Sequence, residues 1–436
     1  MPTINPAGKP TMPTLNRRHF VVASTAAIAA TTLTRGRSSA ADASSDVVLA
    51  LMGANSRGSD LARQFAQQSG CRIAYVCDPD ERAIEKGIAA ATSQGAAKPQ
   101  GIRDFRQALD DPAVDALICA APNHWHAPAT ILACAAGKHV YVEKPCSHSA
   151  EEGELMIAAA KQAKRVVQVG TQRRSGPLYR DAVQKVKEGA IGEPLHAKSW
   201  YHTPRPSIGV GKETPPPAWL DYSLWQGPAP ERPFRDNTLH YNWHFFWNWG
   251  DGEIGNNGVH SIDICRWALG VDFPTRVTFA GKRLRYDDDQ ETPDTANAIF
   301  ECGDKMIVWE QICWLRPVES SSIFGIEIRG TEGLLKLDDE GAKIYDAERK
   351  LVDEFHGGRG DSEHLRDFLD AVRDGHRTNA NIEEGHKSAL FCHLGNIAYR
   401  TGQSVQTDPA TGRILENPAA EKLWAREYRS GWAPKV

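Results

Sequence analysis

The chain has 436 residues and a net charge of −4 at pH 7, and 41% of its residues are hydrophobic. This length is sufficient for two domains, and the slightly acidic balance argues against nucleic acid or an anionic membrane as a partner. The nine cysteines are an odd number without a C-x-x-C pair. Because several of them lie in or beside apolar runs, we predict buried free thiols and no disulfide framework.

Residues 1–43 have the pattern of an export signal. Arg17 and Arg18 form a twin-arginine pair, residues 21–33 form an apolar stretch too short to span a bilayer, and Ala41-Asp42-Ala43 resembles a cleavage site. We therefore expect the twin-arginine machinery to export the folded protein to the periplasm. Residues 1–43 carry five basic residues and one acidic residue, so the remaining chain has a net charge of −8, and we expect no membrane partner after cleavage.

Residues 46–170 are predicted to form a dinucleotide-binding Rossmann domain. An apolar strand at 47–52 leads into a glycine turn, and a second strand at 72–77 ends at Asp78. Strands and amphipathic helices alternate through this region, which is typical of a doubly wound parallel sheet. Further strands are expected at 116–121, 140–142 and 165–170, and helices at 81–91, 103–109, 127–136 and 150–163.

The glycine turn and Asp78 predict NAD as the cofactor. Asn55 stands at the middle glycine position, and asparagine tolerates a left-handed backbone better than other residues with side chains. Taken alone, the turn could equally be an ordinary connection between a strand and a helix. The carboxylate of Asp78 can accept hydrogen bonds from ribose hydroxyls and would repel a 2′-phosphate, which favours NAD over NADP. Export in the folded state suits a tightly held cofactor. The residues expected to bind it at the turn are Gly53, Asn55, Ser56, Arg57 and Gly58.

Residues 171–436 are predicted to form an α+β substrate domain with a mostly antiparallel sheet. Past residue 171 the alternation of strands and helices stops, and a Pro/Trp-rich loop region spans 203–249. A sheet that is covered by helices on one face accounts for the later pattern. Strands are expected at 196–201, 276–282, 295–301, 305–313, 323–329 and 333–337, and helices at 178–188, 258–269, 362–373 and 382–400.

A lysine at the end of a buried strand, in one crevice with a nucleotide-binding turn, indicates hydride-transfer chemistry. The strand at 140–142 leads into Glu143-Lys144-Pro145, and proline then ends the strand. Ligands of open α/β sheets gather at the carboxyl ends of the strands. We therefore expect Lys144 and the glycine turn to face one crevice.

Together these segments resemble the Gfo/Idh/MocA family of oxidoreductases over essentially all of the chain after the signal. The resemblance rests on Glu143-Lys144-Pro145 and on Pro122-Asn123-His124-Trp125-His126 after the preceding strand. Residues 168–174 and 426–432 are similar to an exported, Planctomycetes-type branch. The resemblance implies that Lys144 lies between nicotinamide and substrate. It also implies that the cofactor is bound by Pro122, Asn123, His126, Glu143 and Lys144.

The family's second catalytic segment falls at residues 255–263. His260 would serve as general base for a carbinol while Lys144 stabilises the developing alkoxide. The family's dehydrogenases have an aspartate four positions before this histidine, whereas this chain has Asn256, which cannot accept a proton. We expect Asp263, three residues after His260 on the same helix face, to orient the imidazole instead.

The aromatic-rich second domain predicts a carbohydrate substrate, because tryptophan faces pack on the C–H faces of sugar rings. By the resemblance, Arg173, Trp243 and His244 are the expected substrate contacts. The histidines around the site lack the tight spacing of metal ligands, so no metal is predicted.

Three functions remain open. The leading hypothesis is a periplasmic NAD-dependent oxidoreductase acting on a hydroxyl or ketone of a sugar or glycoside. The second is a glycoside hydrolase that uses NAD transiently for oxidation and elimination, and the third is a non-catalytic sugar-binding protein of the same fold. By the resemblance, a homo-oligomer, dimer or tetramer, is expected to form through the sheet of the second domain.

Overall fold

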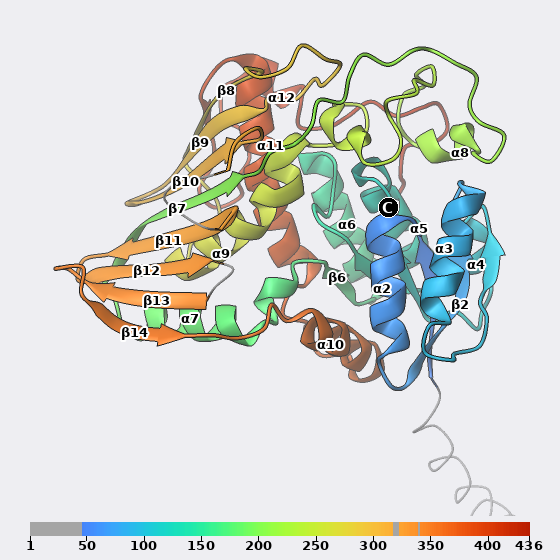
Figure 1. The fold of residues 1–436 in the computed structure, drawn as a ribbon, viewed down its shortest axis with the longest axis horizontal. Helices are drawn as coiled ribbons and strands as arrows, with labels where there is room; N and C mark the ends of the chain where they lie inside the picture. Colours follow the sequence, from blue (N-terminus) through green and yellow to red (C-terminus); the bar gives the residue numbers. More distant parts are fainter. Residues whose placement is uncertain (1–45, 317–321, 339–340) are drawn as a thin grey trace, which may run out of the picture. The chain divides into compact units, whose positions relative to one another are not determined.

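Two sheets organise the part of the chain that the structure describes. The computed structural model describes residues 46–316, 322–338 and 341–436, and the predicted export signal lies outside them. Residues Val47–Val436 form one compact unit. Figure 1 shows the parallel sheet with its helices and the second, larger sheet.

The first sheet has the strand order of a dinucleotide-binding fold. Its order is β3-β2-β1-β4-β5-β6, and every adjacent pair is parallel. The predicted doubly wound sheet is therefore confirmed. The strands in the described residues are β1 (Val47–Met52), β2 (Cys71–Cys77), β3 (Gln100–Ile102), β4 (Ala116–Cys119), β5 (His139–Val142) and β6 (Val167–Val169).

Strand β1 is buried on both faces, as expected for a central strand of a parallel sheet. Alternate residues point to opposite sides. Val48, Ala50 and Met52 belong to a core with residues of α5 (Asn123–Ala135) and α6 (Ala150–Ala163). The other three residues of β1 pack with residues of α2 (Ser56–Ala66), α3 (Glu81–Ala91) and α10 (Asp361–Asp374).

The second sheet is mostly antiparallel, as predicted. Its order is β14-β13-β12-β11-β7-β10-β9-β8-β15, and β7 with β10 is its parallel pair. Helices α7 (Pro177–Lys187), α9 (Val259–Leu269) and α11 (Ile382–Thr401) pack on one side (Figure 1). The strands β13, β14 and β15 were not expected. The bounds are β7 (Pro194–His202), β8 (Arg276–Lys282), β9 (Thr295–Cys302), β10 (Lys305–Ile312), β11 (Phe324–Gly330), β12 (Gly333–Asp338), β13 (Gly341–Asp346), β14 (Leu351–Phe355) and β15 (Val405–Gln406).

The C-terminal part of the chain returns to the first sheet. Leu365 and Phe368 of α10 share a core with Phe65 of α2. The backbone N–H of Val169 in β6 donates to the carbonyl oxygen of Ala380 at 2.8 Å. Helix α10 thus contributes to the core of the Rossmann domain, although it follows the predicted boundary at residue 170.

Helix α5 begins earlier than the sequence indicates. The segment Asn123–His126, expected in a loop, forms its first turn. Pro128 lies inside the helix and cannot donate to the carbonyl oxygen of His124. Arg426 from the C-terminal tail supplies the missing donor, because its Nη2 lies 2.7 Å from that oxygen. A contact across 302 residues therefore supports the helix here.

The remaining short elements lie around the crevice and in the tail. They are α4 (Arg106–Leu109), α8 (Tyr222–Gln226), α12 (Pro418–Glu421), two 3₁₀ segments (Gln172–Arg174 and Asn242–Phe245) and a π-helical segment (Ile254–Gly258).

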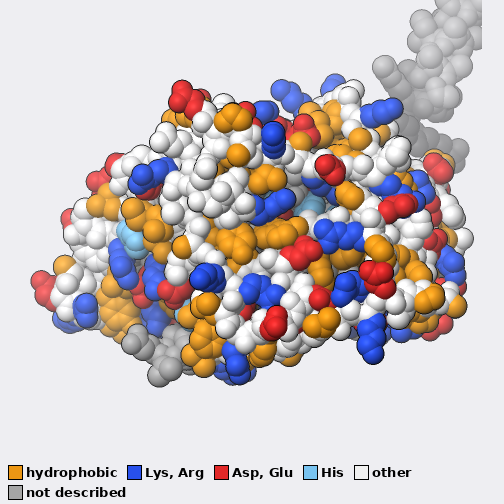
Figure 2. Space-filling view, turned by 90° about the horizontal axis from the view of Figure 1, so that it is seen from above, with side chains coloured by type: hydrophobic (Ala, Val, Ile, Leu, Met, Phe, Trp, Pro, Cys, Tyr) orange, Lys and Arg blue, Asp and Glu red, His pale blue; other side chains and the backbone are white. Residues whose placement is uncertain are grey.

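The nine cysteines are free thiols, and eight of them are buried, which confirms the prediction. In the described ranges, no helix is both long and apolar enough to cross a membrane. Figure 2 shows acidic and basic side chains interspersed over the face seen from above, with apolar side chains between them.

Candidate active site

One cavity of about 480 Å³ runs from the glycine turn after β1 to the start of α9. It brings together most of the predicted site residues from both halves of the chain. Gly58, Arg173 and Asp263 do not line it. The predicted residues on its wall are Gly53, Asn55, Ser56, Arg57, Asp78, Pro122, Asn123, His126, Glu143, Lys144, Trp243, His244, Asn256 and His260.

The glycine turn has the close backbone packing that a dinucleotide site requires. Gly53 has φ +82°, and a Cβ atom there would lie 2.5 Å from the backbone nitrogen of Ala121. At Gly58 a Cβ atom would lie 1.7 Å from the carbonyl oxygen of Gly53. Asn55 has φ −74°, so it does not adopt the left-handed backbone that asparagine tolerates. In this turn, Gly53 is the residue with a left-handed backbone. The side-chain oxygen of Asn55 accepts a hydrogen bond from Lys86 Nζ at 2.9 Å.

The amino end of α2 is suited to an anion. Within the described residues it has no side-chain cap, and its first turn carries no acidic residue. Its first N–H groups and the positive end of its dipole are therefore left for a phosphate. Beside it, Arg57 Nε donates to Glu143 Oε1 at 2.8 Å, which ties the turn to the Glu143-Lys144-Pro145 segment.

Asp78 lies at the end of β2, where a ribose would be bound. Its carboxylate accepts from the backbone N–H groups of Ala54 at 2.7 Å and Asp80 at 2.9 Å. Burial raises the pKa of Asp78 to about 6, although these two hydrogen bonds oppose the shift. The glycine turn, the uncapped helix and this carboxylate fit NAD.

Asn256 holds Lys144 at the other end of the cavity. Lys144 Nζ donates to the carbonyl oxygen of Asn256 at 2.8 Å and to its Oδ1 at 3.3 Å. Burial lowers the pKa of Lys144 from its usual value, with the charge of Glu143 opposing the shift. Both acceptors on Asn256 are neutral, so they can accept hydrogen bonds from Lys144 whether it is an ammonium or a free amine.

His260 is the second residue of α9 and faces the same cavity. Its Nδ1 is buried and has no hydrogen-bond partner among the residues described. Burial, followed by the positive charges of Arg173 and Lys144, lowers the pKa of His260 well below its usual value. The imidazole is therefore neutral at working pH and can accept a proton.

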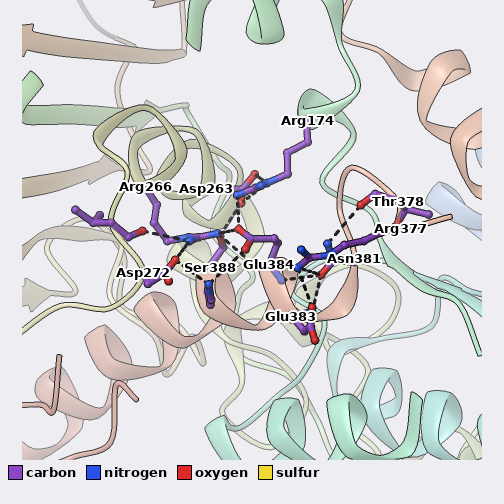
Figure 3. Close-up of polar contacts among 12 residues, drawn as sticks. Arg174, Asp263, Arg266, Asp272, Arg377, Thr378, Asn381, Glu383, Glu384 and Ser388 are labelled. Atoms are coloured by element: carbon purple, nitrogen blue, oxygen red, sulfur yellow. Dashed lines mark hydrogen bonds and ion pairs between the residues drawn. The ribbon is translucent and has the colours of Figure 1, made fainter. Parts of the chain in front are cut away.

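The expectation that Asp263 orients His260 is wrong. The Asp263 carboxylate accepts from Arg174 Nε at 2.8 and 2.9 Å and from the hydroxyl of Ser388 at 2.6 Å. Figure 3 shows Asp263 among these partners. Asp263 is 1% exposed, and its ion pair fixes it inside the second domain. The three-residue spacing places Asp263 near His260 along the helix. It does not determine which neighbouring side chain donates hydrogen bonds to the carboxylate.

Arg173 does not reach the cavity either. Its Nε donates to the hydroxyl of Tyr179 at 3.0 Å, and its guanidinium lies 4.2 Å from the ring centroid of Phe324. The expected contact with substrate is therefore replaced by a buried structural contact. Its positive charge still acts on His260 by lowering the pKa of that imidazole.

Aromatic side chains also line the cavity. The rings of Trp243 and His244 stack with centroids 3.6 Å apart. Burial lowers the pKa of His244 to about 3, so this imidazole is neutral. His126 lies deeper, with its ring nitrogens 2.5 Å from the carbonyl oxygen of Pro145 and 2.7 Å from that of Ala121.

Several residues on the wall were not among the predicted site residues, among them Trp225, His240 and Tyr241. Asn256 Nδ2 donates to the hydroxyl of Tyr241 at 3.4 Å and to Glu253 at 3.3 Å. The concentration of aromatics in 203–249 pointed to this region. Because the segment has no regular period, it did not indicate which side chains face inward.

Two family models match consecutive parts of the chain. The model described as "Oxidoreductase family, NAD-binding Rossmann fold" matches residues 47–171. The model described as "Oxidoreductase family, C-terminal alpha/beta domain", from the same Gfo/Idh/MocA family, matches residues 180–434.

The chain is similar to two relatives with different names. A scyllo-inositol 2-dehydrogenase (NAD(+)) from Bacillus subtilis (strain 168) is 32% identical over 61% of this chain and 65% of its own length. A glycosyl hydrolase family 109 protein from Shewanella pealeana is 28% identical over 36% of this chain and 35% of its own length. The chain thus spans less than two thirds of either relative.

A solved structure shares the fold. Levoglucosan dehydrogenase in complex with NADH and levoglucosan matches with a TM-score of 0.64 at 20% identity, covering 83% of this chain and 99% of that one. The family assignment itself rests on the two models, which cover both sheets. The chain belongs to the Gfo/Idh/MocA family of oxidoreductases, with the family's NAD-binding Rossmann domain followed by its C-terminal α/β domain.

Proposed function

We propose that this protein is an NAD-dependent oxidoreductase that transfers hydride between nicotinamide and a hydroxyl or ketone of a sugar or glycoside. One observation carries this proposal: a single cavity joins the glycine turn and Asp78 to Lys144 and His260. Bound NAD would accept the hydride of the carbinol carbon. The chain's own residues then have to bind the hydroxyl and move its proton.

Lys144 is placed to hold the reacting oxygen. As an ammonium it has three N–H groups, and two of them are directed to the oxygens of Asn256. The third is left for a substrate hydroxyl, whose developing negative charge the ammonium stabilises. When Lys144 is discharged, two N–H groups still suffice for Asn256, and the lone pair is available as a base.

His260 is the second group available for the proton. Its lowered pKa keeps the imidazole neutral, as a general base requires. An imidazole with a low pKa is a weak base. We therefore propose that Lys144 and His260 together polarise the carbinol oxygen. Asp263 takes no part, since Arg174 and Ser388 occupy its carboxylate.

A ring with several hydroxyl groups is the substrate class that the site supports best. Trp225, Trp243 and Tyr241 give the cavity aromatic walls, and His244, Lys144 and Asn256 provide polar contacts. The similar proteins are named for inositol and levoglucosan, both polyhydroxylated rings.

A redox-neutral glycoside hydrolase is the second candidate. The similarity to the glycosyl hydrolase family 109 protein favours it, although that match covers 36% of this chain. The two functions differ in their net production of NADH. A dehydrogenase forms one NADH for each substrate molecule oxidised, whereas a hydrolase frees aglycone without net change in NADH.

The test has two steps. Purified protein is denatured, and any released nucleotide is identified by mass spectrometry, with NAD(H) as the expected result because we propose tight binding. A panel of cyclitols, sugars and aryl glycosides is then followed for both NADH absorbance and free aglycone. Absence of nucleotide together with absence of turnover on the whole panel would contradict the proposal and favour a sugar-binding protein.

We further propose export and self-association. The Arg17–Arg18 pair and the apolar stretch that follows support periplasmic location by the twin-arginine route. Exposed apolar side chains on neighbouring strands of the second sheet, Ile299 of β9 and Met306 of β10, support a dimer or tetramer through its uncovered face. Sedimentation of wild type and an Ile299→Lys variant tests the oligomer, which the variant should weaken.

A further inference from the structure

Glu253 and Arg205 form a buried ion pair behind the proposed active site. Arg205 Nε lies 2.9 Å from Glu253 Oε2, and Arg205 Nη2 lies 3.0 Å from Glu253 Oε1, so the two planar groups meet through two hydrogen bonds. The Glu253 side chain is 1% exposed. Neither residue lines the cavity of about 480 Å³ that contains Lys144. Any effect of the pair on the reaction therefore has to pass through another residue.

The surroundings of the ion pair hold it in place. The backbone N–H of Arg205 donates to the carbonyl oxygen of Cys313 at 2.9 Å, and the Arg205 guanidinium lies 5.1 Å from the ring centroid of Tyr241. Glu253 Oε1 also accepts a hydrogen bond from Asn257 Nδ2. Both oxygens of the Glu253 carboxylate thus have partners that fix their position.

Asn256 lies between this carboxylate and Lys144. It follows Glu253 by three residues, a spacing that puts both side chains on one face of a helical turn. Asn256 Nδ2 lies 3.3 Å from Glu253 Oε1, and Asn256 Oδ1 lies 3.3 Å from Lys144 Nζ. The hydroxyl of Tyr241 is a second acceptor for Asn256 Nδ2, at 3.4 Å. The side-chain amide therefore connects the buried carboxylate to the lysine.

The two charged neighbours of Asn256 leave its amide one favourable orientation. A carboxylate offers only acceptors, and an ammonium offers only donors. The amide must therefore direct its NH₂ group to Glu253 and its oxygen to Lys144. The reversed amide would lose both hydrogen bonds, and it would place N–H groups against the ammonium and an oxygen against the carboxylate.

We propose that Glu253, held by Arg205, is a positioning residue that fixes the Asn256 amide with its oxygen toward Lys144, and so aims the remaining N–H of the lysine at the substrate hydroxyl. This inference rests on the proposed function and extends it to two residues outside the cavity. Burial lowers the pKa of Lys144, and the charges of Glu143 and Glu253 oppose this shift. Glu253 thus acts on the lysine both directly by its charge and indirectly through the amide.

Chemical labelling of Lys144 tests the inference without turnover. Full-length, NAD-saturated protein is treated briefly with acetic anhydride over a range of pH, and the acetylated Lys144 peptide is quantified by mass spectrometry. Only the free amine reacts, so the pH of half-maximal labelling reports the loss of the ammonium. Glu253→Gln should lower this midpoint by about one pH unit or more. The reason is that a charge is lost and that glutamine, which both donates and accepts, no longer dictates the orientation of the Asn256 amide.

Three comparisons separate positioning from charge. In an Asn256→Ala background, Glu253→Gln should shift the midpoint by less than about half as much, because no amide is left to orient. Glu253→Asp keeps the charge but is one methylene shorter, so it should also lower the midpoint. Asp288→Asn is the matched control, because Asp288 forms an equally buried ion pair with Arg283 outside the cavity. This control should leave the midpoint unchanged.

Three outcomes would overturn the inference. They are an unchanged midpoint in Glu253→Gln, an equal shift with and without the Asn256 side chain, and an unchanged midpoint in Glu253→Asp. If Glu253→Gln does not fold, the Glu253→Asp comparison decides. Because labelling needs no substrate, a protein that shows the expected shifts but oxidises nothing on the substrate panel would contradict the proposed reaction and leave the positioning of Lys144 intact.

Discussion

Lys144 Nζ lies 2.8 Å from the backbone carbonyl oxygen of Asn256 and 3.3 Å from its side-chain oxygen. Asn256 therefore holds the lysine in place rather than relaying a proton. On its other side, Asn256 Nδ2 donates to Glu253, whose carboxylate is also paired with Arg205 at 2.9 Å. Asn256 thus accepts hydrogen bonds from Lys144 and donates one to Glu253, which is itself paired with Arg205.

Changing Asn256 to aspartate should move the pH dependence of the reaction. The new carboxylate would stabilise the ammonium form of Lys144 and raise its pKa, so the free amine would appear only at higher pH. We expect the acidic limb of kcat/KM to move upward by about one pH unit or more. Asn256→Ala is the matched control, since it keeps the backbone carbonyl and adds no charge. An unchanged limb in the aspartate variant would show that Lys144 does not act as a base.

Removal of either cavity group should reduce turnover without loss of cofactor. We expect His260→Ala to lower kcat by about 10²–10⁴, the range for a general base, and Lys144→Met by at least about 10². Both variants should still bind NAD, because the glycine turn and Asp78 are unchanged. His376→Ala, at an exposed histidine outside the cavity, is the control. Near-normal turnover in His260→Ala would leave Lys144 as the sole base.

Local sequence patterns were sufficient to predict the Rossmann domain. The apolar run of β1, the turn glycines and the strand ending at Asp78 depend on contacts between neighbours in sequence. The role of Asp263 could not be predicted in this way, because its partners Arg174 and Ser388 are 89 and 125 residues distant. The early start of α5 had the same cause, since the donor for the His124 carbonyl is Arg426.

Replacing Asp263 should affect stability rather than chemistry. Asp263→Ala leaves Arg174 buried without its main partner, which typically costs about 3 to 5 kcal/mol in the free energy of unfolding. Urea unfolding measures this loss, and kcat is measured on the folded protein in the same buffer. We expect kcat within about threefold of wild type. A kcat loss as large as that of His260→Ala, with unchanged stability, would return Asp263 to the active site.

Export should depend on the twin-arginine pair. Changing Arg17 and Arg18 together to lysine keeps the charge but removes the pair that the export receptor reads. We expect the variant to accumulate in the cytoplasm, while wild type appears in the periplasmic fraction. Lys9→Arg, another charge-conserving change in the same segment, serves as control. Equal periplasmic amounts of both proteins would show that residues 1–43 are not a twin-arginine signal.

Cofactor selectivity should depend on pH through Asp78. The pKa of Asp78 is raised to about 6 by burial, so its negative charge is present above this pH and is lost as the pH falls through it. Above pH 6 the carboxylate repels the 2′-phosphate of NADP, so wild type should prefer NAD strongly at pH 8. At pH 5 the uncharged carboxyl should discriminate less.

The phosphate also titrates near pH 6 and loses part of its charge over the same range. Asp78→Asn separates the two effects, because its amide carries no charge at either pH while the phosphate still titrates. Dissociation constants of NAD and NADP, measured on refolded apoprotein at pH 5 and pH 8, should give a larger change in selectivity for wild type than for Asp78→Asn. If the variant preferred NAD at pH 8 as strongly as wild type, the discrimination would not come from the charge of Asp78.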